Sequence, residues 1–324
     1  MMNLKTWKTA ACTGALGAIS LLASAAPLNR AEVAANPTWV AHLDCDALRP
    51  TTIGKYILAE MDKPEARAKL ADFQSMFDLD LRTQLHGVTL YGVKPGPDDA
   101  VLIVYAEFDA DRLVELAKAR DDAGSTPHGS VVIYNWIDEN RKARNGEKPR
   151  VYGAIQGKRV ILGRREDSVA RALDVLAGSA ASLATDAAFP ELGKSGSGHF
   201  IEAATRKMNL PDADPNAAIM KTARTIQVVM GESNQQFKGA VTLVADNEEG
   251  AEHVQSIAQG LLALAKLQTD KPAATKFASA VSLKQDGSRV VGSLVLPAGE
   301  MVEILKANAE RKAARQAKAP QDQP

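Results

Sequence analysis

The stretch AVSLKQDGSRVVGSLVLP, residues 280–297, decides the fold class of this chain. It contains two runs that are typical of strands, and Asp286-Gly287 between them is a strong signal for a two-residue type I′ hairpin turn. A second hairpin is predicted over residues 151–163, around Gly157-Lys158. Such adjacent antiparallel strands break the strict strand–helix alternation of a parallel doubly wound fold. The sequence therefore predicts the α+β class, with mainly antiparallel sheet and helices packed on one face.

The same order of elements occurs twice along the chain. A strand, a helical stretch, two strands, a helix, a hairpin and a final helix follow one another in residues 37–178 and again in 198–306. This pattern predicts an internal duplication into two similar α+β units, each with its own sheet. Residues 178–198, rich in Ala, Ser and Gly, are the expected boundary, and the polar residues 309–324 are expected to form a disordered tail.

The first residues have the pattern of an export signal. Lys5 and Lys8 precede an uncharged stretch of small and apolar residues that ends at Ala23-Ser24-Ala25. This pattern predicts a signal peptide, residues 1–25, with cleavage between Ala25 and Ala26; Val33-Ala34-Ala35 is a second acceptable site. The apolar stretch is too short for the roughly 20 residues of a spanning helix. We therefore expect an exported chain, periplasmic or extracellular, with no transmembrane segment after cleavage.

Composition excludes several classes of protein. The 39 basic residues balance the 39 acidic ones, so no global charge favours nucleic acid as a partner. Apolar residues make up 45% of the chain, which is typical of a globular protein. Cleavage after Ala25 would remove Cys12 and leave Cys45 alone, so an intrachain disulfide is not expected. Cys45 ends an apolar run, which favours a buried thiol over a reactive one.

Two strand-to-helix steps, at residues 100–109 and 288–297, resemble those of uncharacterised exported bacterial proteins. The stretch Phe77-Asp-Leu-Asp80 before His86-Gly-Val-Thr-Leu-Tyr91 is similar to the same group. In those proteins a signal peptide leads into tandem α+β units, and no catalytic role is assigned. The resemblance implies an architecture and a compartment, and it implies no functional residue.

Candidate catalytic and metal-binding motifs are incomplete. His42, Asp44 and Asp46 alternate along a predicted strand, which is the spacing of a metal site, but we favour a polar exposed strand face with Asp46 as a helix cap. Gly193-Lys194-Ser195 lacks the earlier glycine of a phosphate-binding loop, because that position is Ala188. No Gly-x-Ser-x-Gly elbow occurs. We therefore expect no catalytic residue, no bound metal and no cofactor.

Two kinds of surface remain as candidate binding sites. Lys158, Arg159, Arg164 and Arg165 flank one hairpin strand, and Arg141, Lys142 and Arg144 precede it; they favour a solvated basic face or an anionic partner. Apolar stripes at residues 70–77 and 254–265 favour core packing or a ligand cavity between sheet and helices. The first hypothesis is a non-enzymatic binding or scaffold protein with an unknown protein or envelope component as its partner. The alternatives are a carrier of an apolar ligand and a metal-dependent hydrolase around His42.

Overall fold

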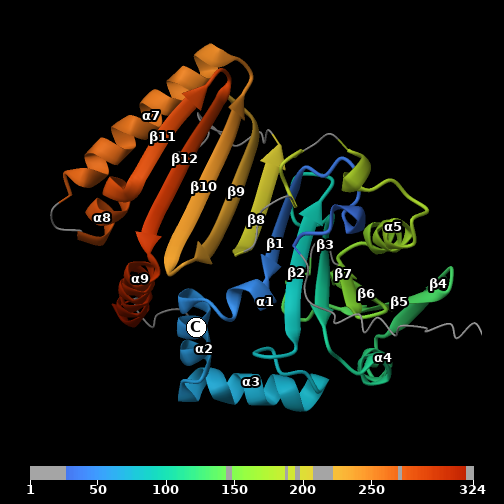
Figure 1. The fold of residues 1–324 in the computed structure, drawn as a ribbon. Helices are drawn as coiled ribbons and strands as arrows, with labels where there is room; N and C mark the ends of the chain where they lie inside the picture. The colour runs from blue at the N-terminus through green and yellow to red at the C-terminus, as the bar shows by residue number, and fades with distance from the viewer. Residues whose placement is uncertain are drawn as a thin grey trace, which may run out of the picture.

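The computed structural model describes residues 27–143, 148–186, 189–193, 198–206, 222–268 and 272–318. Their strands form one antiparallel sheet of twelve strands in the order β11-β12-β10-β9-β8-β1-β2-β3-β7-β6-β5-β4 (Figure 1). The predicted α+β class is confirmed. The predicted signal peptide, with Ala25 and Ala26, lies outside the described residues.

The two predicted units supply the two halves of this sheet. The first half contains β1 Trp39–Asp44, β2 Leu85–Gly92, β3 Ala100–Ala106, β4 Gly124–His128, β5 Val131–Ile137, β6 Arg150–Gln156 and β7 Arg159–Gly163. The second half contains β8 His199–Arg206, β9 Ala223–Ser233, β10 Gln236–Ala245, β11 Val281–Asp286 and β12 Arg289–Pro297. From the centre outward the order is β1-β2-β3-β7-β6-β5-β4 on one side and β8-β9-β10-β12-β11 on the other. Duplication of an ancestral unit remains a prediction.

The expectation that each unit has its own sheet is wrong. Strands β1 and β8 pair antiparallel from Trp39 with Thr205 to Leu43 with Ile201, so one hydrogen-bonded sheet crosses the boundary between the halves. The physical reason is that each strand would otherwise present an open edge of unpaired N–H and C=O groups. Alternation within a strand does not reveal its neighbour.

The helices around the sheet are α1 Cys45–Leu48, α2 Thr52–Met61, α3 Pro64–Phe77, α4 Ala110–Lys118, α5 Glu166–Leu176, α7 Glu248–Lys266, α8 Pro272–Ala280 and α9 Ala298–Lys318, with 3-10 turns η1 Arg30–Glu32 and η2 Leu183–Thr185. Several begin as their sequences predict. Asp109 caps α4 through the N–H groups of Asp111 and Arg112, and Pro64 is the first residue of α3.

Strand register defines two faces of the sheet. Directly paired residues share a face, so Ala41, Ala203 and Val228 lie on what we call the Ala41 face, and Val40 lies with His42 on the opposite His42 face. Helix α5 packs on the His42 face of the first half. Helices α7, α8 and α9 pack on the Ala41 face of the second half, over β10–β12 (Figure 1). Each half thus has its main helices on one face, and the two covered faces are opposite.

The tight hairpin turns follow two patterns. Asp286 pairs with Arg289, so the central residues of that turn are Gly287 and Ser288, and only Gly287 has a positive φ, of 53°. This is the type II′ pattern, and the predicted type I′ turn centred on Asp286-Gly287 is wrong by one residue. The turn between β9 and β10 has positive φ at both Asn234 and Gln235, as type I′ requires.

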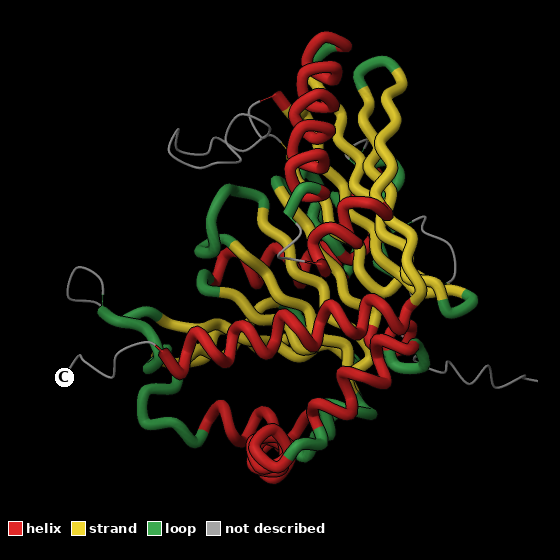
Figure 2. Tube along the Cα trace, turned by 90° about the vertical axis from the view of Figure 1, so that its left-hand side faces the viewer, coloured by secondary structure: helices red, strands yellow, loops and turns green. Residues whose placement is uncertain are grey.

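The boundary segment and the C-terminal tail are both structured where the structure describes them, and the expectation of a disordered tail is wrong as far as Lys318. The described part of the boundary is packed: Leu183, Phe189 and Leu192 are buried, and the Arg30 guanidinium donates hydrogen bonds to four main-chain carbonyls between residues 183 and 192. The expected disordered tail is helical as far as Lys318, as part of α9, which Figure 2 shows along its length. Ala, Glu, Lys, Arg and Gln are strong helix formers, so a helix can continue there without an apolar face.

Candidate functional site

A cavity of about 770 Å³ lies on the Ala41 face at the centre of the sheet. Its walls and floor are mostly apolar. The side chains of Trp39, Ala41, Leu90, Leu102, Val151, Leu162, Ala203, Ile226 and Val228 line it. These residues come from seven neighbouring strands, from β9 to β6. Six spacings of about 4.8 Å make the hollow about 29 Å across the strands.

The local sequence explains why the sheet is hollow at this point. Ala41 and Ala203 face each other across the seam between β1 and β8, and both have small side chains. Leu90 and Leu102 stand on one side of the two alanines, and Val228 on the other. Helices α7, α8 and α9 contact the Ala41 face over β10–β12, and among the described residues no helix packs on the cavity floor over β1–β3.

One end of the cavity is polar. Arg164 and Asp138 line it at the end of the hollow nearest β6 and β7. The Arg164 guanidinium lies 3.6 Å from a carboxylate oxygen of Asp98, and the Arg141 guanidinium lies 3.8 Å from the same oxygen. Arg164 and Asp138 therefore line this end; Asp98 lies beside it through the contact with Arg164, and Arg141 through the contact with Asp98.

His42 does not lie on an exposed strand face as expected. The residue is 5% exposed, because the His42 face is covered by α5 and the segment around η1. Its Nδ1 lies 2.9 Å from Thr89 Oγ1, the Thr89 hydroxyl donates to Tyr105 Oη, and the Tyr105 hydroxyl donates to Glu32. Arg159 pairs with Glu32 at 2.7 Å. The cluster is a chain of buried hydrogen bonds that ends in an ion pair.

The environment of His42 favours its neutral form. Burial lowers its pKa to about 4, against a smaller opposing effect of the Glu32 charge. Nε2 is buried and has no hydrogen-bond partner among the described residues. A proton on Nε2 would place an unsatisfied charged N–H in the interior, which is unfavourable. His42 is therefore a neutral buried histidine in this fold at neutral pH.

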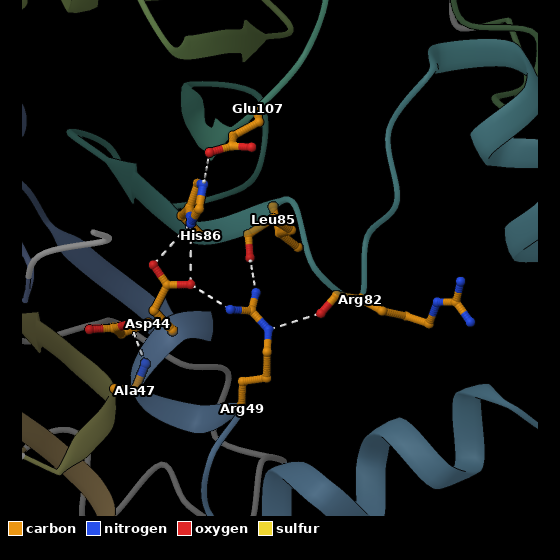
Figure 3. Close-up of polar contacts among 8 residues, drawn as sticks. Asp44, Ala47, Arg49, Arg82, Leu85, His86 and Glu107 are labelled. Carbon is orange, nitrogen blue, oxygen red and sulfur yellow. Dashed lines mark hydrogen bonds and ion pairs between the residues drawn. The ribbon is translucent and has the colours of Figure 1, made fainter. Parts of the chain in front are cut away.

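The other two members of the predicted cluster take different roles. Asp44 caps α1 by accepting a hydrogen bond of 2.8 Å from Ala47 N–H, a role that the sequence assigned to Asp46. Asp46 is the first-turn acid of α1 and lies 2.9 Å from His86 Nδ1 (Figure 3). The structure does not bring His42, Asp44 and Asp46 together. No group of three or more metal-ligating side chains occurs within the described residues.

His86 joins two carboxylates from different elements. Its Nε2 lies 3.5 Å from Glu107, which follows β3, while Arg49 binds Asp46 at 2.7 Å and donates to the carbonyls of Arg82 and Leu85 (Figure 3). These contacts connect the start of α1 to β2. Burial raises the pKa of the neighbouring Cys45 thiol to about 11, so this thiol is protonated at neutral pH and is a poor nucleophile. The cluster holds segments together and has no activated nucleophile.

The predicted apolar stripes do not line the cavity. In α7, Val254 is buried on the sheet, but Leu261 and Leu264 are 56% and 61% exposed, so the expectation that they face inward is wrong. The second half of α7 packs beside α8 instead. In α3 no residue is buried, and Met76 is 53% exposed. Lys194 and Ser195 of the phosphate-loop-like sequence lie outside the described residues.

Sequence reasoning missed the cavity because its lining comes from seven strands whose order was unknown. The one signal in the sequence was that Trp39 and the small residue Ala41 share a face of the same strand, and that His42 lies on the other face. The His86 cluster was equally hidden, since Asp46 and His86 are 40 residues apart and the intervening helices conceal their proximity.

Comparisons with known proteins do not assign the chain to a family. No protein-family model matches the chain, and no curated protein matches it significantly. Three crystal forms of TP0453 are similar in structure: form III has a TM-score of 0.49 at 10% identity, form I 0.46 at 11% and form IV 0.45 at 10%. The alignments cover 87–88% of this chain and 97–100% of TP0453. At this level of similarity they support no functional conclusion. No helix among the described residues is long and apolar enough to cross a membrane.

Proposed function

We propose that this chain is an exported, non-enzymatic binding protein that holds an apolar ligand in the cavity on the Ala41 face. The observation that supports the proposal is the size and lining of the cavity. Its volume of about 770 Å³ lies within the ~300–1,000 Å³ range of small-molecule sites. Apolar side chains dominate its surface, with a few polar groups at one end, as such sites require.

The proposal changes the place of binding that the apolar stripes suggested. The ligand lies on the open sheet surface, and the stripes of α3 and α7 take no part. Export to the periplasm or outside the cell belongs to the proposal and depends on the signal pattern of residues 1–25. A hydrolase around His42 is less well supported, because both His42 and the Thr89 hydroxyl beside it are buried, and no group of three metal-ligating side chains occurs among the described residues.

A fluorescence titration with an uncharged apolar dye such as Nile red tests the site. We expect Ala203→Phe, which fills the cavity floor, to weaken dye binding about tenfold or more. The matched control is Leu264→Ser, which removes an exposed leucine of α7 and should leave the affinity unchanged. Trp39 lines the cavity, so its emission should change on binding and Trp39→Phe should abolish that change. The proposal would be contradicted if Ala203→Phe left dye binding intact while Leu264→Ser abolished it. It would also be contradicted if the unmodified chain did not bind the dye.

A further inference from the structure

We infer that the ligand is a single-chain amphiphile with an anionic head group, which Arg164 binds at the polar end of the cavity. This inference rests on the proposed function and adds the chemical class of the ligand. It depends on the hydrogen bonding of Arg164, on the shape of the hollow and on the charges around its polar end.

Arg164 differs from the other half-buried arginines of the first half. Arg49, Arg150 and Arg159 each donate hydrogen bonds to carboxylate, amide or carbonyl oxygens. The Arg164 side chain is 35% exposed, and its guanidinium makes no hydrogen bond to a described residue; the carboxylate paired with it is that of Asp98, at 3.6 Å. A guanidinium carries five N–H donors, and a carboxylate or phosphate can accept two of them in parallel. Arg164 thus has unfilled donors beside an apolar wall.

The hollow has the dimensions of an extended hydrocarbon chain. From Arg164 it runs across the strands over Leu102, Leu90 and Ala41 to Val228, within the span of about 29 Å. One leaflet of a bilayer core is about 15 Å thick, so a single acyl chain that starts at Arg164 fits within this length. Small side chains at the seam leave room for the chain, and the surrounding leucine and valine side chains supply its contacts.

The charges at the polar end favour an anion that replaces Asp98. Arg164 and Arg141 share Asp98, whose side chain is 58% exposed, and neither contact has hydrogen-bond geometry. Asp138 also lines this end and repels an anion, so the head group must lie on the Asp98 side of Arg164. Arg165 points elsewhere, because it pairs with Asp167 at 2.5 Å and with Asp99 at 3.4 Å.

Isothermal titration of the chain from Ala26 with dodecanoate, dodecyl phosphate and dodecan-1-ol tests the head group. We expect Arg164→Gln to weaken binding of the two anions about tenfold or more, because it removes charge-assisted hydrogen bonds. Binding of the alcohol should change less than about twofold. The matched control Arg165→Gln removes the neighbouring charge and should leave all three affinities unchanged. If Arg164→Gln weakened binding of dodecanoate alone, the head group would be assigned as a carboxylate. If it weakened binding of dodecyl phosphate alone, the head group would be assigned as a phosphate.

A second variant separates anchoring from a structural role of Arg164. Asp98→Asn should tighten binding of both anions, because it removes the carboxylate that competes for the guanidinium. Equal affinities of the acid and the alcohol, unaffected by Arg164→Gln, would overturn the anchor and leave the proposed function intact. Failure of all three ligands to bind the unmodified chain would overturn both. An equal loss with Arg165→Gln would show attraction by surface charge and would also contradict the anchor.

Discussion

The depressed pKa of His42 makes the stability of the fold depend on pH. The folded chain holds this imidazole neutral down to about pH 4, whereas in the unfolded chain it takes up a proton near its ordinary value of 6.5. Between these values the unfolded state binds more protons, so the free energy of unfolding falls as pH decreases. The contribution is complete above about pH 6.5 and is lost by about pH 4. It amounts to about 3 kcal/mol at most.

Urea unfolding of the unmodified chain and of His42→Gln at pH 7 and pH 4.5 tests this prediction. We expect the variant to be less stable at pH 7, since it replaces a buried ring that is packed against Tyr105 and bonded to Thr89. Its loss of stability on acidification should be smaller than that of the unmodified chain. Asp44, whose pKa burial raises, acts in the opposite direction in both proteins and cancels in the comparison. An equal pH dependence in the two proteins would contradict the assignment to His42.

The sequence predicted the right strand and the right alternation around His42, but it predicted that the His42 side would be exposed, and that side is buried. Alternation placed Trp39 and Ala41 on one side and Val40 and His42 on the other, and the structure confirms this division. Which side is buried depends on two covering elements outside the strand. η1 precedes the strand, and α5 follows it more than 100 residues later. A histidine and an aspartate on a strand look exposed until the covering element is known, because polarity alone does not exclude a buried hydrogen-bonded pair.

At the scale of elements, the hairpin between β11 and β12 depends on one backbone conformation. Gly287 has a φ of 53°, and a Cβ added there would meet nothing within 4 Å, so a substitution introduces backbone strain without a clash. We expect Gly287→Val to lower the free energy of unfolding by about 1–3 kcal/mol. Hydrogen exchange should show reduced protection at this hairpin.

A matched control is Gly299→Ala, in α9. This glycine also has free space around its Cβ position and has no positive φ. Alanine is the better helix former, so the control should be neutral or stabilising by up to about 1 kcal/mol. Equal destabilisation by the two substitutions would contradict the role of the turn conformation.

Elements with a clear internal pattern were predictable from the sequence, and their partners were not. The strands at 39–44, 100–106 and 289–297 alternate clearly, and the Asp109 cap and the Pro64 start are local signals. β4, at 124–128, was missed, because Gly124-Ser-Thr-Pro-His128 has no apolar alternation and its Pro127 is tolerated only at a sheet edge. The helical part of the tail was missed because it has no buried face to produce periodicity.

At the scale of the whole molecule, the seam between β1 and β8 joins the two halves and forms the cavity floor. The proposed ligand site and the connection of the halves therefore depend on the same residues, Ala41 and Ala203. Neither half alone contains the complete floor, and for this reason no stretch of sequence within one unit could have indicated the site.

The N-terminal segment adds a second connection between the halves. Leu28, Val33 and Ala34 are buried in the core of the first half, and Glu32 forms the ion pair with Arg159. Arg30 holds the carbonyls of the chain that leads into β8. A mature chain that begins at Ala26 keeps all of these contacts. Cleavage after Ala35, the second site that the sequence allows, would remove them.

We therefore predict that the exported protein begins at Ala26 and that a chain beginning at Asn36 is severely destabilised. Loss of the buried Leu28 and Val33 side chains alone costs about 3–6 kcal/mol, and Arg159 would lose its carboxylate partner Glu32. N-terminal sequencing of the secreted form and urea unfolding of the two chains provide the measurements. An Arg30→Lys variant of the longer chain tests the contribution of the guanidinium alone. Lysine keeps the charge, but its ammonium cannot donate to all four carbonyls that the planar guanidinium binds. This variant should lose part of the stability that the shorter chain loses. A chain from Asn36 as stable as the chain from Ala26 would show that the segment is not part of the folded core, and a secreted form beginning at Met1 would contradict the export signal.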